Sequence, residues 1–208
     1  MESEILKYDN LNADQKKNFE RIYLEAFPSN ERRDFNLLIK GIKSRNYFMF
    51  ALVIESNLSA IACIYSPLYN SFALLDYFAV DSNLRGKGIG SIFFRKLAEN
   101  NSIQTWNLLL EVEDPLFDND DQIKTKRIQF YENNGAKLIL NYDYILPDLD
   151  GSGKTTQMKI MIVPKIQIED RLKFIEFIKL VFKELYLSDD SNETLNLNIK
   201  KVPKTLNF

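Results

Sequence analysis

The chain has 208 residues, of which 45% are hydrophobic, so it can bury one full core, alone or with a short appendage, and not two large domains. Lysine and arginine number 27 against 29 aspartates and glutamates, and the formal net charge of −2 argues against a dedicated nucleic-acid binder. Because the sequence has no histidine, it excludes Ser-His-Asp and Cys-His nucleophile systems, zinc sites that need imidazole, and any histidine base.

The N-terminal residues and the single cysteine bear on the compartment. The segment 1–7 begins acidic and lacks a continuous apolar core, so it predicts neither a signal peptide nor a transit peptide. No apolar stretch reaches the roughly 18 residues that a membrane span needs. Cys63 lies in an apolar run and cannot form an internal disulfide, which is typical of a small buried hydrophobe in a reducing compartment. We therefore expect a soluble cytoplasmic protein.

The first eighty residues predict one short strand, two helices and three further strands. A strand at about 3–8 leads to Asn12 and Gln15, which have the spacing of a helix capping box, and that helix should end before Pro28. A second helix is predicted at 31–45, where apolar residues recur at helical spacing. Polar breaks then separate three strands, which we expect to form an antiparallel meander, at 47–55, 58–65 and 72–80.

The next segment mixes helices and strands. After a glycine-rich turn, apolar residues between Ile89 and Leu97 predict a helix, and a strand follows at 105–113. A polar, acidic linker leads to a helix at about 123–134, which should end at Gly135 because glycine is the usual left-handed capping residue. Two more strands are predicted, at 137–145 and 156–163.

The C-terminal part predicts a helix at 166–187 with a wide apolar face. We expect that face to pack on the domain itself or, as the alternative, on a second copy of the chain in a homodimer. Residues 188–208 are rich in Asn and Ser and show no period, so their structure is left open. The chain is therefore divided into a domain at 1–164 and a C-terminal helix and tail at 165–208.

The strongest chemical signal is the glycine-rich turn from Val80 to Ser91, VDSNLRGKGIGS. Such a turn at a helix N-terminus directs main-chain N–H groups at an anion, and the helix dipole favours negative charge, so the turn suits a pyrophosphate. The glycines let a phosphate approach the backbone without a Cβ in the way. Positive charge is added by Arg85, Lys87, Arg95 and Lys96. The alternative is a tight turn with solvated lysines.

The segment Arg85-Gly-Lys-Gly-Ile-Gly90 resembles the Arg/Gln-x-x-Gly-x-Gly/Ala motif of the GNAT superfamily of N-acetyltransferases, which bind acetyl-CoA. The order of the expected elements is also similar, over about residues 3–163. The resemblance implies an α/β (α+β) fold with a mixed, mainly antiparallel sheet flanked by helices, acetyl-CoA as co-substrate, and no metal. It also implies that pantetheine amides pair with the strand Phe78, Ala79 and Val80, and that the pyrophosphate is held by Arg85, Gly86, Lys87, Gly88, Ile89, Gly90 and Ser91.

A second resemblance covers the segment from Arg127 to Ala136, RIQFYENNGA, which is similar to a later helix of the family in which a Phe/Leu-Tyr pair precedes Gly-Phe. That tyrosine commonly protonates the departing CoA thiolate, which implies this role for Tyr131. The alternative is a half-buried helix tyrosine. Ala136 replaces the usual aromatic residue, and Lys124 and Arg127 stand where many members have Asn and Ala, so the contacts with the adenosine side of CoA stay open.

A base is needed because an acceptor amine is mostly protonated at neutral pH. The alternation in LLLEVE at 108–113 puts Glu111 and Glu113 on one face of a strand, where a carboxylate is costly unless a cleft or a partner solvates it. Glu111 also resembles the glutamate of Leu-Glu-Val segments in the ribosomal-protein alanine acetyltransferases. We expect Glu111 to be the base; Glu113, a water chain, or a structural salt bridge to a helix lysine are the alternatives. A strand bulge near Val80 would expose a main-chain N–H for the oxyanion.

Charge placement bears on the acceptor. Between Leu97 and Ile123 there are seven acids and no Lys or Arg, which favours a cationic amine such as a polyamine, a lysine side chain or a peptide N-terminus. A solubilising loop explains the same charges equally well. Members of the superfamily often build the acceptor site between the first two helices, so the resemblance makes specificity candidates of Glu31, Arg32 and Arg33, and an acidic acceptor group stays open.

Three other patterns are set aside. GSGKTT at 151–156 looks like a phosphate loop, but that pattern requires glycine where the chain has Asp148, and a strand follows in place of a helix. The acidic run at 118–121 lacks the glycine and the closing glutamate of a calcium loop. A Rossmann dinucleotide site is opposed by Ser91 at the third-glycine position and by the antiparallel strands before the turn.

These patterns together predict an N-acetyltransferase that moves an acetyl group from acetyl-CoA to a primary amine of a small molecule or peptide. The alternative is a catalytically silent CoA-binding module with a regulatory or assembly role. The acceptor itself is not predicted, because acceptor loops vary while the donor site carries the pattern.

Overall fold

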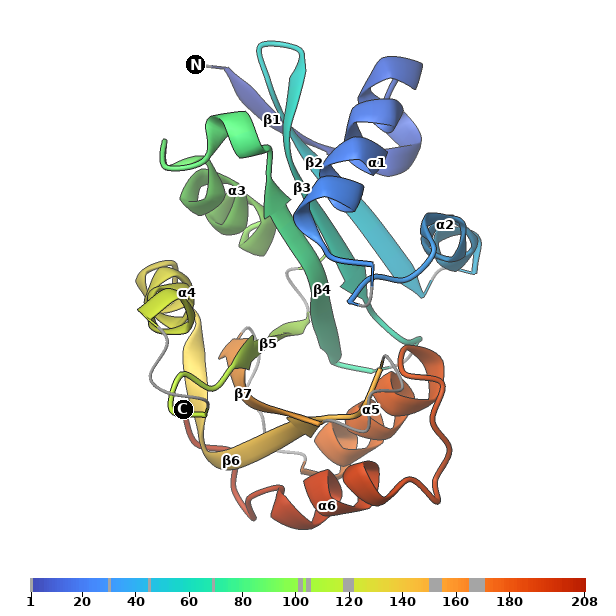
Figure 1. Ribbon diagram of the computed structural model, residues 1–208, viewed down its shortest axis with the longest axis vertical. Coiled ribbons are helices and arrows are strands. Elements are labelled where there is room, and N and C mark those ends of the chain that lie inside the picture. The colour runs from blue at the N-terminus through green and yellow to red at the C-terminus, as the bar shows by residue number, and fades with distance from the viewer. Residues whose placement is uncertain are drawn as a thin grey trace. The chain divides into compact units, whose positions relative to one another are not determined.

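The computed structural model describes residues 2–29, 31–44, 46–68, 70–100, 103, 106–117, 122–149, 155–164 and 171–208 (Figure 1). The chain forms two compact units. The first comprises Met1–Leu68 and Leu74–Gln104, and the second comprises Tyr69–Ala73 and Thr105–Phe208. The second unit contains the helices after residue 164 and also strands that precede residue 164. The predicted division into a domain at 1–164 and a C-terminal helix and tail at 165–208 stays a prediction.

Four strands run through the first unit in the order β1–β2–β3–β4, and each neighbouring pair is antiparallel. The strands are β1 (Ser3–Lys7), β2 (Tyr47–Ile54), β3 (Asn57–Tyr65) and β4 (Phe72–Val80). The antiparallel meander predicted for 47–80 is therefore confirmed. Nearly every residue of β2 and β3 is buried, so side chains on both faces of the sheet enter a core.

One irregularity interrupts the pairing of β3 with β4. The register shifts between Cys63 and Ile64, which leaves Asp76 as the extra residue on β4. Val80 lies opposite Ala60 in regular register. In the pairing with β3, the bulge therefore lies at Asp76 and not near Val80, where it was expected. The Asp76 carboxylate binds Arg33 on the loop before α2, a contact that local sequence does not reveal.

Helices cover both faces of this sheet, α1 (Ala13–Ala26) and α2 (Phe35–Lys43) on one face and α3 (Ile89–Ala98) on the other (Figure 1). Two adjacent residues of β4 contact the helices on the two opposite faces of the sheet. The ring of Tyr77 packs edge-on against Tyr23 of α1, with centroids 4.9 Å apart. Phe78 stacks on Phe93 of α3 at 5.3 Å. Alternation along β4 thus joins α1 and α3 to one sheet.

Local capping decides where the first two helices begin. Asn12 and Gln15 form the reciprocal capping box predicted for α1, and α1 ends at Ala26 before the proline, as predicted. Helix α2 begins at Phe35, later than the predicted residue 31. The side chain of Asp34 accepts a hydrogen bond from the Asn36 N–H, so Asp34 is the N-cap and the residues before it stay outside the helix.

The second unit contains the other three strands. They lie in the order β5–β7–β6, all antiparallel, with β5 at Asn107–Glu113, β7 at Thr156–Val163 and β6 at Lys137–Leu146. Helix α4 (Gln122–Asn133) ends beside Gly135, which has a φ of 97° as predicted for the capping residue. Residue 105, the predicted start of β5, lies outside the described residues.

Helix α5 (Arg171–Glu184) buries the apolar face predicted for the terminal helix within the same chain. Phe174 packs edge-on against Phe72 at 5.4 Å and against Tyr142 of β6 at 5.7 Å. Phe177, Ile178, Val181 and Phe182 are also buried. The expectation that this face packs on the domain is therefore confirmed. A homodimer through the C-terminal helix, the alternative, stays a prediction.

The C-terminal residues left open by the sequence form a further helix, α6 (Glu193–Lys201). Asn192 caps its N-terminus. The fully buried Asn198 exchanges two hydrogen bonds with the main chain of Ile145 on β6, which fastens α6 to that strand. In the part of the chain that the structure describes, no helix is both long and apolar enough to span a membrane.

Candidate active site

The glycine-rich turn runs from η2 (Ser82–Leu84) to the first residue of α3. Gly86 has a φ of 74° and Gly88 a φ of 76°, in the left-handed region where a residue with a Cβ is strained. A Cβ built on either residue would meet nothing within 4 Å. Backbone conformation is therefore the reason for both glycines, and the space in front of this main chain is open.

Helix α3 begins without a side-chain cap. Its N-cap is Gly88, which offers no side-chain cap, and no acidic residue lies in the first turn. The first helical bond joins the Ile92 N–H to the Gly88 carbonyl at 3.1 Å, so the N–H groups before it have no partner within the helix. A helix N-terminus of this kind favours an anion, as predicted from the motif.

The four cations of the motif divide between the two ends of α3. Arg85 and Lys87 are exposed at the turn and each donates to a main-chain carbonyl of the turn at 3.2 Å. Arg95 and Lys96 lie in the last turn of α3, and Lys96 donates to the Ser3 carbonyl of β1 at 3.1 Å. Only Arg85 and Lys87 of the four therefore flank the helix N-terminus.

Asp81 ties the start of the turn to α1. Its carboxylate accepts a hydrogen bond from the Arg21 guanidinium at 2.5 Å and one from the Asn83 N–H at 2.9 Å. Burial raises the pKa of Asp81, but these hydrogen bonds outweigh burial and lower the pKa below its usual value. Neither Arg21 nor Asp81 was predicted from the sequence as a site residue. The Asp-x-Asn spacing could have suggested the local turn, but nothing local links residues 60 positions apart.

The strand residues proposed for pantetheine are the last three of β4. Ala79 is buried, whereas Phe78 and Val80 are partly exposed, as alternation requires. They pair with the β3 residues Ala60 to Ala62. Phe78, Ala79 and Val80 and the glycine-rich turn together form the predicted donor site. All of them belong to the first unit.

Glu111 and Glu113 lie on one face of β5 in the second unit, as predicted. Glu113 pairs with Arg127 at 2.8 Å and with Lys124 at 3.9 Å, both from α4. Glu111 instead accepts a hydrogen bond of 2.5 Å from the hydroxyl of Tyr186, which follows α5. The helix salt bridge that was the alternative reading of Glu111 thus forms at its neighbour.

Tyr131 lies near the end of α4 and is partly buried. Its ring packs edge-on against Phe130 at 5.0 Å, and its main-chain carbonyl accepts from the Ala136 N–H at 3.0 Å, which closes the helix end. Burial raises the pKa of Tyr131 to about 12, although the nearby Arg127 acts in the opposite direction. The hydroxyl therefore keeps its proton at neutral pH and can donate it.

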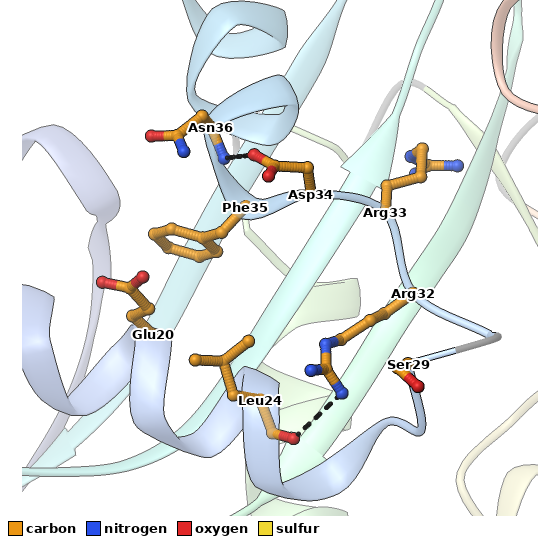
Figure 2. A pocket seen from close by; sticks show the side chains of 8 residues that line it. All are labelled: Glu20, Leu24, Ser29, Arg32, Arg33, Asp34, Phe35 and Asn36. Atoms are coloured by element: carbon orange, nitrogen blue, oxygen red, sulfur yellow. Dashed lines mark hydrogen bonds between the residues drawn. The ribbon is translucent and has the colours of Figure 1, made fainter.

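The loop between α1 and α2 lines a pocket of about 330 Å³ (Figure 2). Figure 2 shows Arg32 reaching toward Leu24, whereas Arg33 points away from it. Arg32 donates to the carbonyls of Leu24 and Phe27 at 3.3 and 2.6 Å and so caps the C-terminal end of α1. Arg33 binds the Asp76 carboxylate and donates to the Tyr47 hydroxyl at 3.0 Å. Both arginines thus have partners inside the first unit.

Comparison with known proteins gives one sequence relative and many solved structures. No protein-family model matches the chain. A Bacillus subtilis (strain 168) protein named "Putative acetyltransferase YjbC" is 29% identical over 123 residues, which are 59% of this chain and 59% of that protein. The match thus spans about three fifths of the relative's length.

The solved structures decide the fold. One described as "Putative acetyltransferase from GNAT family from Bacteroides thetaiotaomicron" has a TM-score of 0.68 at 19% identity, covering 91% of this chain and all of its own. The chain has the GNAT fold. Spermidine N-acetyltransferase of Vibrio cholerae, solved with CoA and spermine, has a TM-score of 0.56 at 12% identity over 77% of this chain and 94% of its own. The fold class inferred from the glycine motif and the element order is therefore confirmed.

Within this GNAT fold, the predicted acidic surface is largely paired where the structure describes it. Glu113 binds α4, and Asp114 pairs with Lys159 at 3.1 Å. Asp118, Asp120 and Asp121 lie outside the described residues, as does 151–154 of the phosphate-loop pattern.

Cys63 is buried, and burial raises the pKa of its thiol, as expected of a small hydrophobe. Among the described residues, no group of three or more acids or cysteines gathers as metal ligands would.

Proposed function

We propose that the protein is an N-acetyltransferase that moves an acetyl group from acetyl-CoA to a primary amine of a small molecule or peptide. The observation that carries the proposal is the turn with left-handed Gly86 and Gly88, in front of which the space is open, at an uncapped helix N-terminus. An arrangement of this kind suits the diphosphate of CoA. The GNAT fold supports the same reading, and the Vibrio cholerae structure with that fold holds CoA and spermine.

On this proposal the donor is held mainly by main-chain atoms. The N–H groups of Gly86 to Ser91 would bind the diphosphate, and Arg85 and Lys87 would add positive charge beside it. Phe78, Ala79 and Val80 would pair with the pantetheine amides. Ile89 is buried, so it would contribute its main-chain N–H and anchor the start of α3 with its side chain.

The acetyl thioester supplies an electrophilic carbonyl when it is bound, and this chain's residues would handle the protons. Glu111 would take a proton from the acceptor ammonium, directly or through water, so that the neutral amine can attack. Attack would form the C–N bond, the C–S bond would then break, and Tyr131 would give its proton to the departing thiolate while the nitrogen loses its remaining surplus proton to solvent. The Tyr131 hydroxyl is protonated at neutral pH, which this role requires.

The proposal is tested by titrating acetyl-CoA calorimetrically and by measuring release of free CoA thiol over a panel of polyamines, amino acids, aminoglycosides and peptides. We expect binding of acetyl-CoA, and release of thiol that depends on one class of amine. Binding without release on any acceptor would favour the silent CoA-binding module. Failure to bind acetyl-CoA would remove both functions.

A further inference from the structure

The C-terminal segment reaches a strand residue that is 75 positions earlier in the chain. The hydroxyl of Tyr186, just after α5, donates a hydrogen bond to a carboxylate oxygen of Glu111 at 2.5 Å, and both side chains are partly buried. A hydrogen bond from a hydroxyl to a carboxylate is stronger than one between neutral groups, and it favours the ionised acid. The bond therefore constrains where Glu111 points, and a bond of this kind stabilises the ionised form.

Aromatic packing holds Tyr186 in place. Its ring meets Phe182 edge-on, with centroids 5.3 Å apart, and Phe182 meets Tyr144 of β6 edge-on at 6.2 Å. Phe182 and Tyr144 are fully buried. The position of the Tyr186 hydroxyl is thus determined by how α5 packs on the sheet of the second unit.

Two other tyrosines of β6 face the same carboxylate. The rings of Tyr142 and Tyr144 are buried, and burial first and the charge of Glu111 second raise the pKa of both. The Tyr142 hydroxyl has no hydrogen-bond partner among the described residues. On β7, the residue opposite Glu111 is the apolar Ile160. Among the described residues, three tyrosines and Ile160 therefore lie near Glu111.

Three cations on α4 and β7 pair with carboxylates other than Glu111. Lys124 and Arg127 of α4 pair with Glu113, and Lys159 of β7 pairs with Asp114 and Asp143. The donor to Glu111 from the C-terminal segment is the neutral hydroxyl of Tyr186. A carboxylate in such surroundings loses charge stabilisation when its hydroxyl donor is removed.

We propose that Tyr186 is a positioning residue that holds Glu111 ionised and correctly oriented as the base, so that the end of α5 contributes to the catalytic apparatus. The inference rests on the proposed function, because it assigns Tyr186 a task only if Glu111 accepts the proton of the acceptor. It assigns α5 a second role besides covering the sheet, since the helix carries the hydroxyl to the base.

The test compares Tyr186→Phe with the matched variant Tyr142→Phe, which removes one hydroxyl from a neighbouring ring that makes no hydrogen bond. The acidic limb of the pH profile of kcat/KM should move to higher pH in Tyr186→Phe, and kcat at neutral pH should fall about tenfold. Tyr142→Phe should leave the acidic limb where it is. A shift in both variants, or in neither, would overturn the proposal.

A double-mutant cycle separates positioning from a general loss of structure. In the Glu111→Gln background, Tyr186→Phe should have no further effect on kcat, because the group that it positions is gone. An equal loss in both backgrounds would mean that Tyr186 acts only through the fold. Circular-dichroism melting of each variant identifies one that is unfolded.

A measurement that does not depend on turnover tests the role of Tyr186 separately from the proposed function. Carbon-13 NMR of glutamate carboxyl groups, with Glu111 assigned by Glu111→Gln, follows its titration directly. The midpoint should rise in Tyr186→Phe and stay in Tyr142→Phe. Such a rise in a protein that releases no thiol with any amine would leave the coupling intact and remove the acetyltransferase. An unchanged midpoint in an active protein would remove the role of Tyr186 alone.

Discussion

The guanidinium of Arg21 on α1 lies 2.5 Å from the carboxylate of Asp81, 60 positions later, where β4 passes into the glycine-rich turn. Asp81 is almost fully buried, and it also binds the N–H of Asn83. One carboxylate thus joins a helix on one face of the sheet to the loop that leads into the helix on the other face. The turn is held at its first residue as well as by its glycines.

The first prediction concerns this anchor. Asp81→Asn keeps the size of the side chain and removes the ion pair, so we expect the free energy of unfolding to fall by about 1–3 kcal/mol. Asp14→Asn is the matched control, because Asp14 is exposed and its lysine partner lies 4.0 Å away. Urea denaturation at neutral pH measures both. Equal stability of the two variants would contradict the assigned role of Asp81.

A second prediction follows from the lowered pKa of Asp81. A carboxyl whose pKa is lower in the folded state stabilises the fold above its unfolded pKa, near 3.9, and that contribution is lost as the pH falls through the folded pKa. The unchanged protein should therefore lose more stability than Asp81→Asn does on acidification below about pH 4. Thermal melts over a pH series compare the two, and parallel curves would exclude Asp81 as a source of the acid sensitivity.

A third prediction separates the two reasons for a glycine. Gly88→Ala is strained because φ is 76°, which costs about 1 kcal/mol, and we expect weaker acetyl-CoA binding because the turn changes shape. Gly41→Ala is the control, since its Cβ would lie 2.9 Å from the Cβ of Tyr47 and so would destabilise α2 for a steric reason. Calorimetry should show weaker binding only for Gly88→Ala. Equal affinities in the two variants would argue against diphosphate binding at the turn.

The fourth prediction concerns Tyr131. Tyr131→Phe should lower the rate of thiol release about 100-fold and keep acetyl-CoA affinity nearly unchanged, as removal of a general acid does. Because the pKa of Tyr131 is about 12, its loss of a proton should cause no decline in rate between pH 7 and 10. Tyr8→Phe, on η1 (Tyr8–Asn10), is the matched control. Unchanged turnover in Tyr131→Phe would contradict the role of Tyr131 as the general acid.

The fifth prediction concerns the ion pair of Arg33 with Asp76 at the β4 bulge. Asp76→Ala leaves the arginine without its carboxylate in a largely buried place, so we expect a loss of about 2–4 kcal/mol in the free energy of unfolding. Replacing both residues by apolar ones of similar size should cost less than the single change. Denaturation of the single and double variants measures the difference, and a double variant that is less stable than the single one would contradict this account.

The local spacing of residues was sufficient to predict most helices and strands and the glycine-rich turn. The capping box of α1, the glycines that need positive φ, the end of α4 at Gly135 and the meander all depend on hydrogen bonds between residues close in sequence, so their patterns can be recognised there. The GNAT fold was recognisable for the same reason, because its glycine motif is one continuous segment.

The tertiary structure alone decided which charged groups meet. The start of α2 depends on the choice of Asp34 as cap, and the Asp76 carboxylate at the bulge binds an arginine 43 positions away. The hydroxyl that donates to Glu111 comes from Tyr186, just after α5 and 75 positions later. Such contacts follow from strand register and helix packing, which sum many weak apolar contacts along the whole chain. The sequence by itself therefore determined the type of fold and the turn, and three-dimensional packing determined what holds the turn and the proposed base.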